Sequence, residues 1–201
     1  MPKISDRRRL QRREQILNAA MACAAREGFH RTTMADVIAA SGLSAGAVYG
    51  YFASKEDLIL ALADRAIGSI EPVLDELLAQ DPCPSIPQAV RRLTQQIEAI
   101  SQQGPDLVPV AIAAWAEAAR NAQVAERVSR RLERLRGSFT ALARTLQQQG
   151  RIAGSADPVA IGRAAAGAIP GYLLQRLIFA DVEPSQYAAG LAALAGRGES
   201  D

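Results

Sequence analysis

Three helix start signals follow one another in the first third of the chain, and they limit the fold more than any other feature. Thr33 and Ser54 each have an aspartate three residues later, the spacing of a capping box, in which a hydroxyl and a carboxylate satisfy backbone N–H groups at a helix start. Ser44 is a further N-cap candidate and closely follows Gly42, a residue type that adopts the left-handed conformation of tight turns. The spacing predicts one short helix ending near Gly42, a second ending near Tyr51 and a third that begins after Ser54.

The first two of these helices have the arrangement of a helix-turn-helix. In that motif a short turn containing glycine joins two helices and leaves the second exposed, where it can enter the major groove of DNA. Val37, Leu43 and Val48 have the spacing to share a small core with Phe52. Burial of these positions leaves five residues pointing outward: Ser44, Ala45, Ala47, Tyr49 and Tyr51. The segment from Thr33 to Phe52 is therefore predicted to read DNA.

The rest of the chain has the pattern of a helical protein. Alternating runs of β-branched and aromatic residues are missing from the sequence, so no sheet is expected. Apolar residues make up 49% of the chain and aromatic residues only 4%, a composition typical of helices packed through small side chains. Pro72 is expected to kink or break a helix, and Asp81 to Pro87 is the clearest loop. The predicted fold is all-α with about nine helices, at 9–28, 33–42, 44–51, 54–78, 88–102, 106–119, 123–149, 157–180 and 183–196.

Positive charge is concentrated at the beginning of the chain. Residues 1–31 hold eight lysines and arginines against three acidic residues, whereas residues 61–201 hold 14 against 15. A basic end on a neutral body favours contact with a polyanion such as nucleic acid. A solubilising, frayed terminus would have the same composition, so charge alone leaves both interpretations open.

Several function classes lack support in the sequence. Cys23, Cys83 and the single histidine, His30, are too few and too widely spaced for a zinc site or a disulfide framework, so no metal or cofactor is expected. No nucleophile elbow or phosphate loop accompanies His30, which argues against an enzyme. The first residues lack the apolar stretch of a signal peptide, and no apolar run of about 18 residues could span a membrane, so a cytoplasmic protein is expected.

The segment that contains the predicted helix-turn-helix has an ordered series of short sequence motifs. These are Ile16-Leu17-Asn18-Ala19-Ala20, Gly28-Phe29, Thr32-Thr33, Ile38-Ala39, Ser41-Gly42-Leu43-Ser44, Ala47-Val48-Tyr49-Gly50-Tyr51-Phe52 and Ser54-Lys55-Glu56-Asp57-Leu58. Through these motifs, residues 13–62 resemble the DNA-binding domain of the tetracycline-repressor (TetR) family.

Two further motifs are Ala114-Trp115-Ala116-Glu117-Ala118 and Gln149-Gly150-Arg151. Through them, residues 105–180 resemble more weakly the ligand-binding domain of BetI-like members.

The resemblance implies DNA contacts at named positions. Those near bases and backbone are Ser44, Ala45, Gly46, Ala47 and Tyr49; Tyr51 and Lys55 fall at phosphate-contacting positions, and Thr33 at the helix start that meets the strand. A lysine in the first turn of a helix opposes the helix dipole at a cost of about 0.3–1 kcal/mol. A phosphate held between Lys55 and the helix start would turn that cost into a gain. The structural alternatives are a solvated Lys55, packing roles for the two tyrosines, and a cap role for Thr33, which holds in either case.

The predicted reading helix has unusually small side chains. Residues 44–51 contain no Arg, Asn, Gln or Glu, so the bidentate contacts that give about 1–3 kcal/mol of base discrimination are missing. Ala45 and Ala47 can touch thymine methyl groups. We expect specificity to depend on DNA shape, on Arg31 or on the basic N-terminal segment.

The resemblance also implies two domains, a DNA-binding domain at 1–53 and a helical ligand-binding and dimerisation domain at 54–201. Residues 159–180 are apolar nearly all round, so this helix must be covered on both sides. In the family the last two helices form a four-helix interface between subunits, which implies a homodimer through 158–180 and 184–195. A buried helix in a monomer would give the same pattern.

An effector pocket is expected in the second domain. The residues best suited to line it are Trp115, Tyr172, Gln175, Phe179, Gln102 and Glu98, and their apolar surroundings favour an apolar or amphipathic ligand. The expected protein is a TetR-type regulator, most simply a repressor. It would bind a palindromic double-stranded DNA operator as a dimer and be released by a small-molecule effector. A ligand-independent or architectural DNA-binding protein is the alternative.

Overall fold

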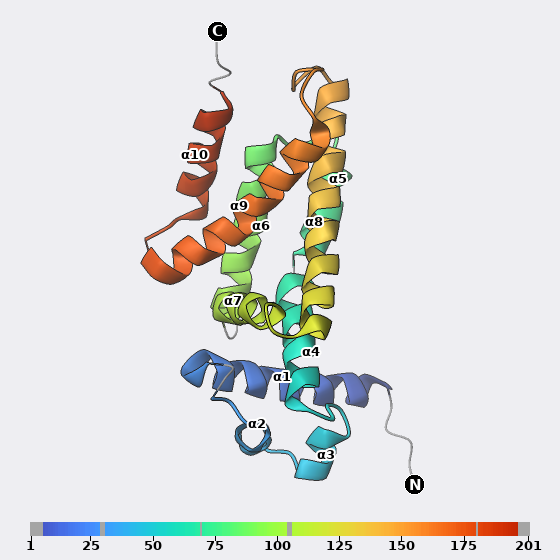
Figure 1. Cartoon of the computed structure of the whole chain (residues 1–201), viewed down its shortest axis with the longest axis vertical. Coiled ribbons are helices and arrows are strands. Elements are labelled where there is room, and N and C mark those ends of the chain that lie inside the picture. Colours follow the sequence, from blue (N-terminus) through green and yellow to red (C-terminus); the bar gives the residue numbers. More distant parts are fainter. Residues whose placement is uncertain (1–5, 29–30, 69, 104–105, 180, 197–201) are drawn as a thin grey trace. The chain divides into compact units, whose positions relative to one another are not determined.

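The computed structural model describes residues 6–28, 31–68, 70–103, 106–179 and 181–196 (Figure 1). Ten helices and no strand lie in these ranges, which confirms the all-α fold. The helices are α1 Asp6–Glu27, α2 Met34–Ser41, α3 Ala45–Tyr49, α4 Lys55–Gly68, α5 Glu71–Leu78, α6 Ile86–Gln103, α7 Leu107–Ala118, α8 Ala122–Gln148, α9 Pro158–Phe179 and α10 Pro184–Ala195. Not one of these described helices is long and apolar enough to cross a membrane. The helix end predicted at Ala180 lies outside the described residues.

The tenth helix arises at Pro72, which splits the helix predicted over residues 54–78. α4 ends at Gly68 and α5 begins at Glu71, with Pro72 in its first turn. A proline has no N–H to bond the preceding turn, whereas the first turn of a helix leaves its N–H groups without helical partners. The chain therefore breaks here, and Pro72 begins a new helix.

Helix α6 begins at Ile86, so the loop predicted to end at Pro87 is too long. The Ser85 N–H donates to Gln88 Oε1 at 2.8 Å, and the Gln88 N–H donates to Ser85 Oγ at 3.4 Å. This reciprocal cap fixes the helix start, and Pro87 then falls in the first turn, where its missing N–H costs nothing.

The chain divides into two compact units. Unit 1 contains residues 1–66 and 101–128, and unit 2 contains residues 67–100 and 129–201. Helices α4, α6 and α8 contribute residues to both units. The expected boundary between a DNA-binding domain and a ligand-binding domain, at residues 53 and 54, is a functional division and stays a prediction.

Unit 1 is built on the apolar face of α1. Ile16, Leu17 and Met21 of this face are buried, and α1 contacts both α2 and α7. Val37 of α2 and Val48 of α3 are completely buried as well. Burial of a side chain of this size stabilises a fold by about 1.5–3 kcal/mol. Helices as short as α2 and α3 would not persist alone, so this packing holds them in place.

Unit 2 contains a close crossing of α8 and α9, visible in Figure 1. A Cβ atom at Gly162 of α9 would lie 2.9 Å from the Thr140 backbone nitrogen and 3.0 Å from the Arg136 carbonyl oxygen. Neither backbone atom can rotate away, so the crossing requires a glycine at this position. Phe139 of α8 and Tyr172 of α9 are among the largest fully buried side chains of the protein.

Two arginines of α8 hold the polar side of α5. Arg131 pairs with Glu71, and Arg134 pairs with Glu71 at 3.2 Å and with Asp75 at 3.3 Å. These groups are partly exposed, and exposed ion pairs contribute only about 0–1 kcal/mol each. The pairs orient α5, while burial of Leu74 and Leu77 on its other side supplies the stability.

Candidate nucleic-acid interface

The predicted capping box at the start of α2 is present. The Asp36 N–H donates to Thr33 Oγ1 at 3.2 Å, and the Thr33 N–H and hydroxyl donate to Asp36 Oδ2 at 2.8 and 2.7 Å. The hydrogen bonds from the Thr33 side chain and backbone hold the pKa of Asp36 below its usual value. The cap fixes the first turn of α2 and leaves Thr33 exposed at the surface.

The turn between α2 and α3 is fixed by Gly42 and by a contact from α1. Gly42 has a φ of 66°, in the left-handed region, and its N–H donates to the Ala39 carbonyl. Gln15 Nε2 of α1 donates to the Ser41 carbonyl oxygen at 2.8 Å. The contact from Gln15 was not predicted, since nothing in the spacing of a polar residue on an amphipathic helix identifies its partner.

Helix α3 is only five residues long and ends at Tyr49, earlier than the predicted end near Tyr51. Ser44 caps it by accepting a hydrogen bond from the Ala47 N–H at 3.3 Å, and buried Val48 anchors it. Tyr49 is 48% exposed, which is unusual for a large aromatic side chain. Of the positions predicted to contact DNA on this helix and its flanks, Ser44, Ala45, Gly46 and Tyr49 are exposed, and Ala47 and Tyr51 are half-buried.

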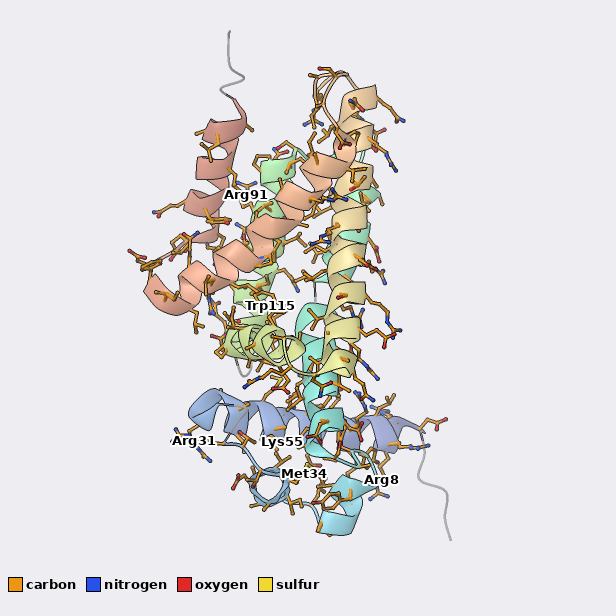
Figure 2. The ribbon with its side chains drawn as sticks, viewed as in Figure 1. Arg8, Arg31, Met34, Lys55, Arg91 and Trp115 are labelled. Atoms are coloured by element: carbon orange, nitrogen blue, oxygen red, sulfur yellow. The ribbon has the colours of Figure 1, made fainter. Side chains whose placement is uncertain are left out.

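Basic side chains lie at several places on unit 1 (Figure 2). Lys55 is the first residue of α4, after Ser54, whose Oγ accepts the Asp57 N–H at 3.1 Å. Arg31 is exposed just before α2, and Arg8 is exposed in the first turns of α1. In Figure 2 Arg31 and Arg8 lie at opposite sides of this unit, with Lys55 between them. The surface that carries α3 is therefore flanked by positive charge, the sign that phosphates require.

One arginine of α1 has a structural role that spacing did not predict. The Arg13 guanidinium lies over the ring of Phe52, 5.5 Å from its centroid. Stacking of this kind contributes about 0.5–1 kcal/mol at exposed sites. It ties the segment that follows α3 to α1.

Two of the six residues predicted to line an effector pocket lie in unit 1. Trp115 of α7 is half-buried, and its indole N–H is buried with no hydrogen-bond partner among the described residues. Gln102, near the end of α6, is exposed. An unpaired buried donor costs about 1–3 kcal/mol, so Trp115 is the more informative of the two.

The other four lie in unit 2, where the structure brings two of them together. The Tyr172 hydroxyl donates to Glu98 Oε1 at 2.6 Å, and Arg176 Nε donates to the same oxygen at 2.5 Å. Burial of Tyr172 and its contact with Glu98 raise the pKa of the phenol. Gln175 and Phe179 are exposed, with Phe179 63% exposed. The Glu98 carboxylate and the Tyr172 hydroxyl are thus hydrogen-bonded to each other, whereas Gln175 and Phe179 lie exposed at the surface.

The described residues contain no group of three or more His, Cys, Asp and Glu side chains that could hold a metal ion. Cys23 and Cys83 are buried, and the Cys23 thiol donates to the Asp36 carbonyl oxygen at 3.8 Å. His30 lies outside the residues that the structure describes.

Residues 16–62 match the family model described as bacterial regulatory proteins, tetR family. This segment, under a quarter of the chain, is similar to the DNA-binding domain of that family. The match covers the capping box, the Gly42 turn and α3, which are the features that gave the predicted helix-turn-helix.

Curated relatives match the same part of the chain. An uncharacterised HTH-type transcriptional regulator, YfiR of Bacillus subtilis, is 38% identical over 66 residues, 33% of this chain and 32% of that protein. The HTH-type transcriptional repressor Rv1474c of Mycobacterium tuberculosis is 40% identical over 63 residues, 31% of this chain and 34% of that protein. The aligned segments thus span about a third of the length of these relatives. Both relatives are named as transcriptional regulators.

Solved structures match nearly the whole chain and show its fold. Salmonella enterica GusR superposes with a TM-score of 0.74 at 24% identity, covering 96% of each chain. A TetR transcription regulator from Haloarcula marismortui has a TM-score of 0.75 at 18% identity, covering 92% of this chain and 96% of that one. A gamma-butyrolactone receptor described as ArpA-like has a TM-score of 0.70 at 23% identity, covering 95% and 89%.

Proposed function

We propose that this protein is a cytoplasmic TetR-type transcriptional repressor that binds a palindromic operator as a dimer and releases it when a small ligand binds. The observation that carries the proposal is the five-residue helix α3, capped by Ser44 and anchored by Val48, within a segment that matches the family. An exposed helix held rigidly on a small core is the arrangement that enters a major groove.

The DNA contacts fall into two groups. Ser44, Ala45, Gly46, Ala47 and Tyr49 approach the bases and the backbone from α3, and Thr33, Tyr51, Lys55 and Arg31 contact phosphates around it. Gly46 has no atom within 4 Å of its Cβ direction, so the helix face is open there to a close backbone approach. Because α3 carries no Arg, Asn, Gln or Glu, affinity comes mainly from phosphate contacts, and base discrimination is modest.

The second subunit docks on α9 and α10. Leu174, Leu177, Ile178 and Phe179 are all exposed near the end of α9, and Leu194 of α10 is 77% exposed. Several large apolar side chains left exposed on neighbouring turns, as at the end of α9, mark an interaction site. A two-fold dimer presents two α3 helices to the two halves of a palindrome, which one short helix cannot read alone.

The effector is an apolar or amphipathic molecule, and the ligand domain is of the BetI-like type. The candidates to contact it are Trp115, Tyr172, Gln175, Phe179, Gln102 and Glu98. The unpaired indole N–H of Trp115 supports its place among them, because a ligand acceptor would satisfy it. Release follows if the ligand favours a conformation in which the two α3 helices are badly spaced for the operator.

Selection of bound sequences from random double-stranded DNA, followed by a ligand screen against the recovered site, tests the proposal. We expect a palindrome to be enriched, and at least one ligand to weaken binding. Trp115 is the single tryptophan of the chain, so quenching or a shift of its emission reports binding directly. Failure to enrich any palindrome contradicts the proposal that this protein is a transcriptional regulator. A palindrome whose affinity no ligand changes indicates a ligand-independent DNA-binding protein instead.

A further inference from the structure

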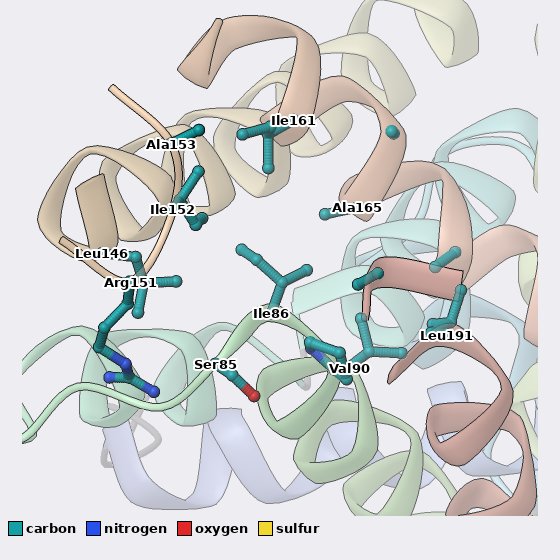
Figure 3. Close-up of a pocket in the computed structure, with 14 residues that line it drawn as sticks. Ser85, Ile86, Val90, Leu146, Arg151, Ile152, Ala153, Ile161, Ala165 and Leu191 are labelled. Atoms are coloured by element: carbon teal, nitrogen blue, oxygen red, sulfur yellow. The ribbon is translucent and has the colours of Figure 1, made fainter. Parts of the chain in front are cut away.

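Unit 2 contains an apolar cavity that none of the predicted effector-binding residues lines. Its volume is about 590 Å³, within the range of small-molecule sites. The walls come from the start of α6, the end of α8, the segment between α8 and α9, and parts of α9 and α10 (Figure 3). Aliphatic side chains dominate the lining, among them Ile86, Val90, Leu146, Ile152, Ile161 and Leu191. Such a surface favours a hydrocarbon chain.

The polar side chains of this cavity are Ser85 and Arg151. In Figure 3 the Arg151 guanidinium lies on the same side of the cavity as Ser85, away from the aliphatic side chains of Ile161 and Ala165. A ligand that fills the cavity would therefore meet charge in one direction only.

A second cavity adjoins the first, because Arg151 lines both. Its volume is about 450 Å³, and its lining includes three arginines and no acidic residue: Arg91, Arg92 and Arg151, with Gln80, Gln88 and Gln149. All three arginines are exposed, and neither Arg91 nor Arg92 has an ion pair with any described residue. Three positive charges without a balancing carboxylate attract an anion.

The backbone around Arg151 is fixed by the end of α8. Gly150 has a φ of 68°, its N–H donates to the Gln147 carbonyl at 3.0 Å, and the Arg151 N–H donates to the Leu146 carbonyl at 2.8 Å. These are the two hydrogen bonds of a Schellman motif. Gln147 Nε2 also donates to the carbonyls of Ala153, Gly154 and Ala156 at 2.9–3.0 Å, which holds the wall that follows.

The Arg151 side chain is held at one end of its guanidinium. Nη1 donates to the Cys83 carbonyl at 2.6 Å and lies 3.4 Å from Gln149 Oε1. Nη2 and Nε have no partner among the described residues. Three N–H donors thus remain, in the fork geometry that binds a carboxylate or a phosphate through two hydrogen bonds. Because the side chain is already positioned, little conformational entropy is lost on binding.

We infer that these two cavities form one site for an amphipathic anion, with a hydrocarbon chain in the apolar cavity and a carboxylate or phosphate head group at Arg151. Arg91 and Arg92 add positive potential around the head group. A neutral apolar molecule would leave the arginines unused, and a small inorganic anion would leave the apolar cavity unfilled. The site does not include the residues proposed above for the effector. Binding of the anion does not depend on the proposed function; an effect of that binding on DNA affinity would rest on it.

Calorimetry on the full chain without DNA tests the site. The probes share one chain and differ in the head group: dodecanoate, dodecyl phosphate, dodecanol and dodecylammonium, each below its micellar concentration. We expect both anions to bind at least tenfold more tightly than the alcohol or the amine. Shortening the carboxylate chain should weaken binding by about fourfold per methylene, the transfer free energy of one buried CH₂.

Variants locate the head group. Arg151→Gln should weaken both anions at least tenfold and leave dodecanol unchanged, whereas Arg144→Gln, at an exposed position of α8, should change nothing. Since Arg151 also bonds the Cys83 carbonyl, Arg91→Gln/Arg92→Gln provides a second test at exposed positions, with severalfold weaker anion binding at low salt. Equal binding of anion and alcohol overturns the site, as does inorganic phosphate that binds as tightly as dodecyl phosphate, or anion binding that all these variants leave intact. DNA is absent from the assay, so a failed operator selection is a separate result.

Discussion

The segment from Thr33 to Ser54 and helix α9 are held in place by different interactions. In the first, hydrogen bonds between near neighbours set where short helices begin and end, at the Thr33–Asp36 cap, the Gly42 turn and the Ser44 cap. In α9, apolar residues occur all around the helix, and the buried side is determined by its crossing with α8. Local hydrogen bonds thus determine where a helix lies along the chain, whereas packing determines which side of it is buried. Each prediction below changes one of these two kinds of interaction.

The largest effect is expected where α9 meets α8. In Gly162→Ala the added Cβ would lie within 3.0 Å of two backbone atoms of α8, so the helices must move apart. We expect the free energy of unfolding to fall by about 3 kcal/mol, the upper range for overpacking. Chemical denaturation followed by circular dichroism measures it.

Gly137→Ala is the matched control for that change. Gly137 lies inside α8 with no atom within 4 Å of its Cβ direction. The substitution should raise the free energy of unfolding by about 0.5–1 kcal/mol, through helix propensity alone. A Gly162→Ala variant that is as stable as Gly137→Ala would show that the crossing is not tight.

The second prediction concerns the anchor of α3. Val48→Ala removes two methyl groups from a completely buried side chain and should cost about 2 kcal/mol. It should also weaken operator binding beyond the loss of stability, because α3 loses its only fully buried side chain. Val159→Ala makes the same chemical change at a valine of α9 that is 37% exposed, and should cost less than about 0.5 kcal/mol. Thermal melting and a DNA titration of both variants check this, and similar losses in the two would contradict the role of Val48.

Sequence patterns predicted where the helices of both regions lie, but not which distant side chains meet. The caps at Thr33, Ser44 and Ser54 act within three residues, so spacing alone identified them, and the all-α fold followed from similar signals. The contact of Gln15 with Ser41 joins residues 26 positions apart and gives no local pattern. The cavity at Arg151 was missed for the same reason, since its walls come from α6, α8, the segment after α8, α9 and α10. The DNA and ligand contacts themselves stay predictions.

The third prediction breaks one local cap. Thr33→Ala removes the hydroxyl that accepts the Asp36 N–H and should lower the free energy of unfolding by about 1 kcal/mol at neutral pH. Asp36 has a lowered pKa in the fold, so its cap stabilises above the ordinary carboxyl value of 3.8 and is lost as the pH falls below it.

The pH dependence separates the cap from general loosening. In Thr33→Ala the pKa of Asp36 should rise toward 3.8, because the main hydrogen bond that lowers it is gone. An NMR titration of the Asp36 carboxyl carbon measures the shift. Thr145→Ala, a threonine of α8 whose hydroxyl bonds only the Ala141 carbonyl, is the control. An unchanged Asp36 titration in Thr33→Ala would contradict the cap as its cause.

The smallest effect on the free energy of unfolding is expected at Lys55. The same residue should have a large effect on DNA affinity. Lys55 is in the first turn of α4, where its charge opposes the helix dipole. Lys55→Gln should therefore leave the free energy of unfolding unchanged or raise it by about 0.3–1 kcal/mol. If Lys55 contacts a phosphate, the variant should weaken binding about equally on all DNA sequences and reduce the slope of log affinity against log salt by about 1. The control is Glu56→Gln, which makes a substitution by glutamine at the next residue and should not reduce that slope. A Lys55→Gln variant that loses stability but keeps its salt dependence would place Lys55 among the structural residues, and the positive charge that positions α3 on DNA would then have to come from Arg31 and α1.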